Sequence, residues 1–274
     1  MSTLSPVVDN AIEAAIRRDR MIVIVALFSI IALAWAYLLA GAGMGMSGLE
    51  MTRMSQHELA GHMAHAHAMQ PAVWTAGYAV LMFFMWWIMM LAMMLPGAAP
   101  LILVFATINR RQRDGGNPHV ATSVFTLGYL TAWGGYSVAG TAFQWLFERN
   151  GILSPMLVAN TATLGGILLL AAGIYQLTPL KHACLRRCRS PLDFIAAGWR
   201  RGAGGAFYMG LLHGAFCVGC CWFLMALMFI GGLMNLYWVA GLALFFLLEK
   251  TVPAGRWFAC TTGIVLLLWG ARML

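Results

Sequence analysis

The sequence alternates long apolar runs with short polar segments, which is the pattern of a helical membrane protein. An α-helix needs about 20 consecutive apolar residues to cross the roughly 30 Å hydrocarbon core of a bilayer. We therefore predict an all-α fold, a polytopic transmembrane helix bundle of about seven spans. The expected spans are residues 21–43, 80–108, 120–147, 157–177, 206–230, 236–248 and 256–274.

Composition supports this prediction and removes one alternative. Of the 274 residues, 61% are hydrophobic and 9% are charged, whereas a soluble domain carries about 25% charged residues. The formal net charge of +8 would favour a nucleic-acid partner in a soluble protein. Here the cations lie in short segments between apolar runs, where the positive-inside rule accounts for them. We expect the lipid bilayer, and no nucleic acid, as a partner.

The distribution of the cations predicts the topology. Lys and Arg are enriched near the N-terminus and in alternate connecting segments, which indicates a cytoplasmic N-terminus. We expect a multi-pass protein of a bacterial inner (plasma) membrane. Its expected parts are a cytoplasmic head (1–20) and a single transmembrane domain (21–274), with an outer His/Met-rich segment (44–73) and a basic cytoplasmic loop (178–204).

The outer segment contains a cluster of histidines. Ser55 to Glu58 has the spacing of a capping box, so we expect a short helix that begins at Ser55. Imidazole and thioether groups bind copper, and imidazole also binds zinc or nickel. A flexible loop that happens to be rich in His and Met is the alternative. The candidate ligands are His57, His62, His65 and His67.

The second expected span carries methionines on one helical face. Met85, Met89 and Met93 recur at four-residue intervals, just before Pro96 and Pro100. Residues four apart share a helix face, so these thioethers are candidate metal ligands. Ordinary packing is the alternative, because Met fills irregular gaps between helices.

Two cysteines lie in the basic loop. Cys184 and Cys188 are four residues apart, which places both thiols on one side of a helical turn. The cytosol keeps such thiols reduced, and neighbouring arginines favour thiolates, the form that binds metals. A structural role, or a loop that binds acidic lipid headgroups, is the alternative.

The fifth expected span contains the densest group of candidate ligands. His213, Cys217, Cys220 and Cys221 fall on one stripe of a helix that turns about 100° per residue. An ionisable residue inside a membrane span indicates function. The group is a candidate metal site, and redox chemistry or simple packing are the alternatives. One helix cannot complete a coordination shell, so we expect further ligands from Met85, Met89 and Met93 or from Cys260.

Four stretches resemble a bacterial family of polytopic membrane proteins of unknown function, described as predicted metal-binding integral membrane proteins. The resemblance implies a metal-related role over about residues 75–274. The four stretches are residues 85–100 (MWWIMMLAMMLPGAAP), 180–191 (LKHACLRRCRSP), 213–222 (HGAFCVGCCW) and 249–253 (EKTVP).

These observations favour a membrane protein that binds a soft transition metal and moves it across the membrane or delivers it to a partner. Copper, as Cu(I), fits a ligand set of thiols and thioethers best; zinc and nickel are the alternatives. The partner would be a periplasmic or membrane metalloprotein. We find no nucleotide-binding motif and no catalytic triad in the sequence, so we expect a protein that is not an enzyme. The alternative functions are a transmembrane thiol–disulfide electron carrier and a non-catalytic subunit or assembly factor of a larger membrane complex.

Overall fold

A computed structural model describes residues 6–59, 73–114, 121–154, 157–252 and 255–274, and most of these residues are helical. This confirms the all-α prediction for the described part of the chain. The helices are α1 (Pro6–Leu39), α2 (Gly48–Leu59), α3 (Ala76–Asp114), α4 (Thr122–Arg149), α5 (Ala162–Leu177), α6 (Pro179–Arg189), α7 (Pro191–Gly198), α8 (Gly202–Ala226), α9 (Met228–Gly231), α10 (Leu236–Thr251) and α11 (Gly255–Met273).

The expected seven membrane spans are not confirmed. Among the described residues, three helical segments are long and apolar enough to cross a membrane, namely Arg20–Leu39, Ala76–Arg110 and Gly202–Gly231. A fourth is counted if α5 and α6, which are bent by 66°, form one span. The α10 helix has 16 residues, too few to cross the hydrocarbon core unaided. The α4 helix has 28 residues, but Thr, Ser and Gly make it less apolar.

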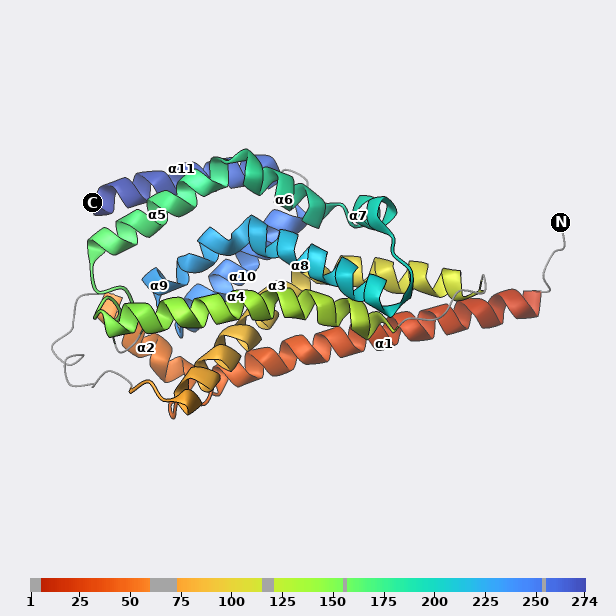
Figure 1. The fold of residues 1–274 in the computed structure, drawn as a ribbon, viewed down its shortest axis with the longest axis horizontal. Helices are drawn as coiled ribbons and strands as arrows, with labels where there is room; N and C mark the ends of the chain where they lie inside the picture. Colours follow the sequence, from red (N-terminus) through yellow and green to blue (C-terminus); the bar gives the residue numbers. More distant parts are fainter. Residues whose placement is uncertain (1–5, 60–72, 115–120, 155–156, 253–254) are drawn as a thin grey trace.

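Helices α4 and α8 cross in close contact at the centre of the molecule (Figure 1). Glycine allows this approach, as is common between membrane helices. A Cβ atom added to Gly210 would lie 1.9 Å from the carbonyl oxygen of Phe125, and one added to Gly128 would lie 2.1 Å from that of Phe207. This crossing places Tyr129 of α4 beside the expected ligand stripe of α8.

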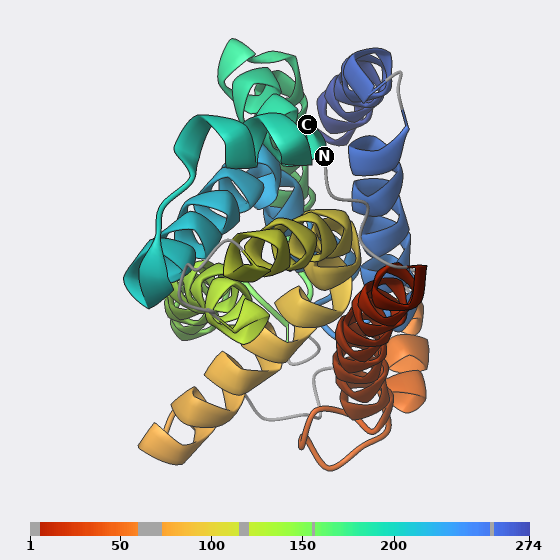
Figure 2. The same cartoon turned by 90° about the vertical axis from the view of Figure 1, so that its right-hand side faces the viewer.

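The remaining helices surround this central pair. Helix α3 packs against α1, α4 and α10, while α5 and α11 form a separate antiparallel pair (Figures 1 and 2). After α5, the chain bends into α6, which lies against α8 and also contacts α10. Helix α6 therefore brings the basic segment back onto the bundle core.

Helix α2, in the segment predicted to be outer, begins earlier than predicted. The backbone N–H of Ser47 donates to the Glu50 carboxylate (2.9 Å), and the N–H of Glu50 donates to Ser47 Oγ (3.3 Å). This reciprocal pair is a capping box, and it holds the pKa of Glu50 below its ordinary value through hydrogen bonds from Ser47. Ser55, the predicted start, lies inside the helix and donates to the Thr52 carbonyl. The same Ser-x-x-Glu spacing occurs twice, and the first copy starts the helix.

The predicted topology places three segments on the outer side of the membrane, and their described parts lie at one end of the bundle. These parts are α2, the connection between α4 and α5, and the start of α10. Thr52 of α2 accepts a hydrogen bond from the N–H of Leu236 (2.9 Å) at the start of α10. The N–H of Ala159, between α4 and α5, donates to the carbonyl of Phe229 (2.8 Å). In Figure 1 these connections lie at the left, at the opposite end from α7.

Candidate functional site

All four side chains of the expected ligand stripe of α8 are buried. His213 is 2% exposed, Cys217 is 1% exposed, and Cys220 and Cys221 are fully buried. The thiols of Cys220 and Cys221 donate to the carbonyl oxygen of Cys217, over 3.0 and 2.9 Å. All six cysteines of the chain are free. Sequence reasoning placed these side chains on one face of a helix, and the structure places that face in the protein interior.

Helix α6 brings the two loop cysteines to this stripe. Cys188 is buried on α6, which packs against α8, and its thiol is a close neighbour of the thiols of Cys217 and Cys220. The Cys184 sulfur lies over Gly219, where an added Cβ atom would be 3.1 Å away. The two cysteine motifs, about 30 residues apart in the sequence, therefore form one group of thiols.

A lysine ammonium approaches the same thiols from α10. Lys250 Nζ lies 3.0 Å from Cys217 Sγ and 3.4 Å from Met94 Sδ. The Tyr129 hydroxyl lies 3.3 Å from Cys217 Sγ and donates to the carbonyl of Met94 (3.2 Å). Gly97 makes room for the lysine, because a Cβ atom there would lie 2.9 Å from Lys250 Cδ. A thiol, a thioether and a cation thus meet at one point.

The neighbouring residue Glu249 faces a different partner. Its carboxylate accepts from Lys181 Nζ (2.6 Å), and both side chains are buried. Lys181 also donates to the amide oxygen of Gln176. Sequence position suggests that Glu249 and Lys250 form an ion pair with each other, and this interpretation is wrong. Successive residues of a helix point in directions about 100° apart, so each reaches a separate neighbour.

His213 lies among aromatic rings. Its imidazole stacks on Tyr129, with centroids 5.6 Å apart, and meets the edge of Phe194 from α7 at 5.3 Å. Within the described residues, His213 Nδ1 is buried and has no hydrogen-bond partner. A buried nitrogen without a partner is destabilising, so this atom is available to a ligand or a proton.

The other predicted ligands occupy different surroundings. Met85, Met89 and Met93 are buried in the core of α3, but the methionine that meets Lys250 beside Cys217 is Met94. Cys260 of α11 is half-buried, on the helix that packs chiefly against α5. His57 is exposed on α2. Three predicted ligands lie outside the described residues: His62, His65 and His67.

In the described part of the chain, no three or more His, Cys, Asp or Glu side chains form a group ready to hold a metal ion. The hydrogen bonds explain this: the thiols of Cys220 and Cys221 point to a carbonyl group, and an ammonium group faces Cys217. The soft donors are close together, but their present directions do not converge on one point. Metal binding at this site requires side-chain rotation.

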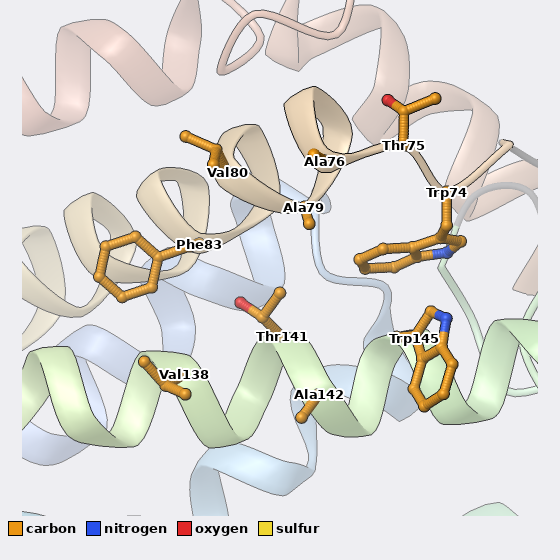
Figure 3. A pocket seen from close by; sticks show the side chains of 10 residues that line it. All are labelled: Trp74, Thr75, Ala76, Ala79, Val80, Phe83, Val138, Thr141, Ala142 and Trp145. Atoms are coloured by element: carbon orange, nitrogen blue, oxygen red, sulfur yellow. The ribbon is translucent and has the colours of Figure 1, made fainter.

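A separate groove lies on the side of the bundle, between α3 and α4 (Figure 3). Its volume is about 590 Å³. Trp74 and Trp145 lie at one end of it, and Trp74 Nε1 donates to the Glu148 carboxylate (2.7 Å). Its lining holds neither thiols nor charged groups: Trp74, Thr75, Ala76, Ala79, Val80, Phe83, Val138, Thr141, Ala142 and Trp145.

Sequence reasoning missed Met94, Tyr129 and Lys250 as members of the thiol site. One signal for Lys250 was present, because only two of the 17 basic residues are lysines, Lys181 and Lys250. Both are buried in the structure, although Lys is almost never fully buried without a partner. No sequence signal marks Tyr129 among the tyrosines, since only the crossing of α4 and α8 places it there.

The four stretches 85–100, 180–191, 213–222 and 249–253 meet at this site. Met94 and Gly97 come from the first, Cys188 from the second, Cys217 from the third and Lys250 from the fourth. Comparisons with curated proteins and with solved structures give no match. A family model described as a copper chaperone matches residues 83–273, a range that includes all four stretches. The chain therefore belongs to the PpoB2 copper chaperone family.

Proposed function

We propose that this protein is an inner-membrane copper chaperone that binds Cu(I) at the thiol site and hands it to a partner protein. The observation that carries the proposal is the meeting of four distant stretches around Cys217, in a chain whose family is described as a copper chaperone. Thiolate and thioether sulfurs are the ligands that select Cu(I). A periplasmic or membrane metalloprotein is the expected recipient.

The expected ligands are the sulfurs of Cys217, Cys220 and Cys188, with Met94 as a further donor. All four are buried, and Cu(I) is held well in such a dry, sulfur-rich environment because it needs no water ligand. Rotation of the Cys220 thiol away from the Cys217 carbonyl would direct it toward the other sulfurs. His213, one turn before Cys217, offers a nitrogen for the entry or exit of the metal.

In this proposal the protein crosses the membrane several times with its N-terminus in the cytoplasm. The gathering of α2, the α4–α5 connection and the start of α10 at one end of the bundle supports a common outer face. The exposed His57 lies on α2, within the segment 44–73 that is expected to be outer. Copper would be collected by this segment and passed to the buried thiols.

Elemental analysis of the protein purified in a mild detergent tests the proposal. We expect copper in the wild-type protein and a loss of most of it in the double variant Cys217→Ser/Cys220→Ser. Cys260→Ser is the matched control, because Cys260 lies on α11, and this variant should keep its copper. Wild-type protein that takes up no copper, or a double variant with unchanged content, contradicts the proposal.

Transmembrane thiol–disulfide exchange is a second candidate, because Cys188 lies close to Cys217 and Cys220 on another helix. This function requires a disulfide between α6 and α8 that forms and breaks during turnover. Alkylation of free thiols before and after mild oxidation, followed by mass spectrometry, separates the two candidates. A reversible Cys188 disulfide in copper-free protein favours redox exchange, whereas thiols protected from alkylation only by copper favour the chaperone.

A further inference from the structure

The position of Lys250 indicates which group occupies the thiol site before copper binds. Its ammonium lies 3.0 Å from the sulfur of Cys217 and 3.4 Å from that of Met94. These are the two sulfur types that bind Cu(I), and the ammonium contacts both. One ammonium group therefore lies within contact distance of both sulfurs.

The surrounding residues fit this lysine. Gly97 leaves the space through which the lysine stem passes, since a Cβ atom there would lie 2.9 Å from Cδ and 3.5 Å from Nζ of Lys250. Glu249, the acidic residue next to Lys250 in the sequence, forms an ion pair with Lys181 (2.6 Å). Among the described residues, Lys250 Nζ donates hydrogen bonds to these two sulfurs alone. A buried cation requires a compensating partner, and Cys217 is the group placed to provide it.

We propose that Lys250 is a placeholder cation: its ammonium occupies the Cu(I) position between Cys217 and Met94, and copper enters by displacing it. This inference rests on the proposed function of the same site. With Cys217 as the thiolate and Met94 as the thioether, this exchange conserves the charge between the two sulfurs, because one monovalent cation leaves as another arrives; a further thiol that binds as a thiolate would release its proton. The lysine stem is long enough to carry its ammonium toward the membrane surface, since Lys250 lies in the last turn of α10 and lysines commonly reach the interface in this way.

The exchange would also make the site prefer monovalent over divalent metal ions. Zn²⁺ or Ni²⁺ in place of the ammonium would add one positive charge to a buried environment, where uncompensated charge is strongly unfavourable. Cu(I) adds none. Lys250 would therefore favour a monovalent soft metal before any difference in ligand geometry is considered.

Amine labelling of the wild-type protein tests the displacement directly. The two lysines make the readout simple, because Lys181 serves as an internal control for protein opening. We expect little modification of Lys250 in copper-free protein in detergent, and a several-fold increase after Cu(I) is added, while Lys181 stays protected. Cys217→Ser should show no copper-dependent increase. If the wild-type protein binds copper in a way that requires Cys217 but Lys250 stays protected from labelling, this inference is overturned. The chaperone proposal would then remain intact.

Affinity measurements on Lys250→Leu provide the second test. With Cu(I) titrated against a chromophoric Cu(I) chelator, we expect the variant to bind at least about tenfold more tightly than wild type, comparable to the loss of one charge-assisted hydrogen bond. We expect Zn²⁺ binding to increase as well, while Lys250→Arg, which keeps the charge, should not gain affinity. Unchanged or weaker Cu(I) binding by Lys250→Leu overturns the inference. Wild-type protein that binds no Cu(I) overturns the proposed function as well.

Discussion

At the scale of single residues, the thiol site and its surroundings contain buried charged side chains whose partners lie on other helices. Lys181 and Glu249 form a buried ion pair between α6 and α10, and Lys250 meets the Cys217 sulfur. The removal of one member of such a pair leaves an uncompensated charge in the interior, whereas the removal of both does not. The pair therefore fixes α6 against α10 and holds Cys188 near Cys217.

We expect Lys181→Leu to lower the free energy of unfolding by about 3–5 kcal/mol, because Glu249 would remain buried and unpaired. The double variant Lys181→Leu/Glu249→Leu should recover most of this loss. Thermal unfolding of both variants in the same detergent measures the effect. A double variant that is less stable than the single variant would show that the pair contributes more than mutual charge compensation.

At the scale of helices, the crossing of α4 and α8 positions Tyr129 next to His213 and Cys217. Glycine at the crossing allows the helix backbones to touch, and a larger residue forces them apart. The predictions from sequence were least accurate at this scale. The helix expected from Ser55 begins at Gly48, and the expected basic loop contains α6 and α7. Local signals such as a Ser-x-x-Glu spacing occur more than once, and tertiary contacts select among them.

We expect Gly210→Ala to destabilise the protein by about 1–3 kcal/mol, the usual cost of added volume in a packed interior. Its new Cβ atom would lie 1.9 Å from the Phe125 carbonyl oxygen, a backbone atom that cannot move alone. Gly204→Ala on the same helix is the matched control, because a Cβ atom there meets nothing within 4 Å. Melting temperatures that fall equally in both variants would show that the crossing does not depend on Gly210.

At the scale of the whole molecule, the start of α10, helix α2 and the α4–α5 connection lie at one end of the bundle and α7 lies toward the other (Figure 1). Three helical segments in the described residues are able to cross a membrane by length and composition, and shorter helices accompany them. The buried residues of the thiol site come from α3, α4, α6, α8 and α10, so the site lies within the bundle and not at its surface.

An epitope tag inserted at Gly151, an exposed turn after α4, should be accessible to antibody in spheroplasts of intact cells. A tag inserted after Trp199, between α7 and α8, should become accessible only after the membrane is permeabilised, because the basic segment is expected in the cytoplasm. Accessibility of both tags from the same side would contradict the proposed topology.

The helical fold, the apolar character and most of the sulfur side chains of the thiol site could be predicted from the sequence alone, because these follow from local periodicity and residue chemistry. His213, Cys217, Cys220 and Cys221 share a face on any helix. Only the tertiary structure decided which side chains complete the group. The bend between α5 and α6 brings Cys188 close to Cys217, and the packing of α3 against α10 brings Met94 to the ammonium group of Lys250, which contacts Cys217. Those arrangements depend on contacts between residues far apart in the chain, and no local pattern records them.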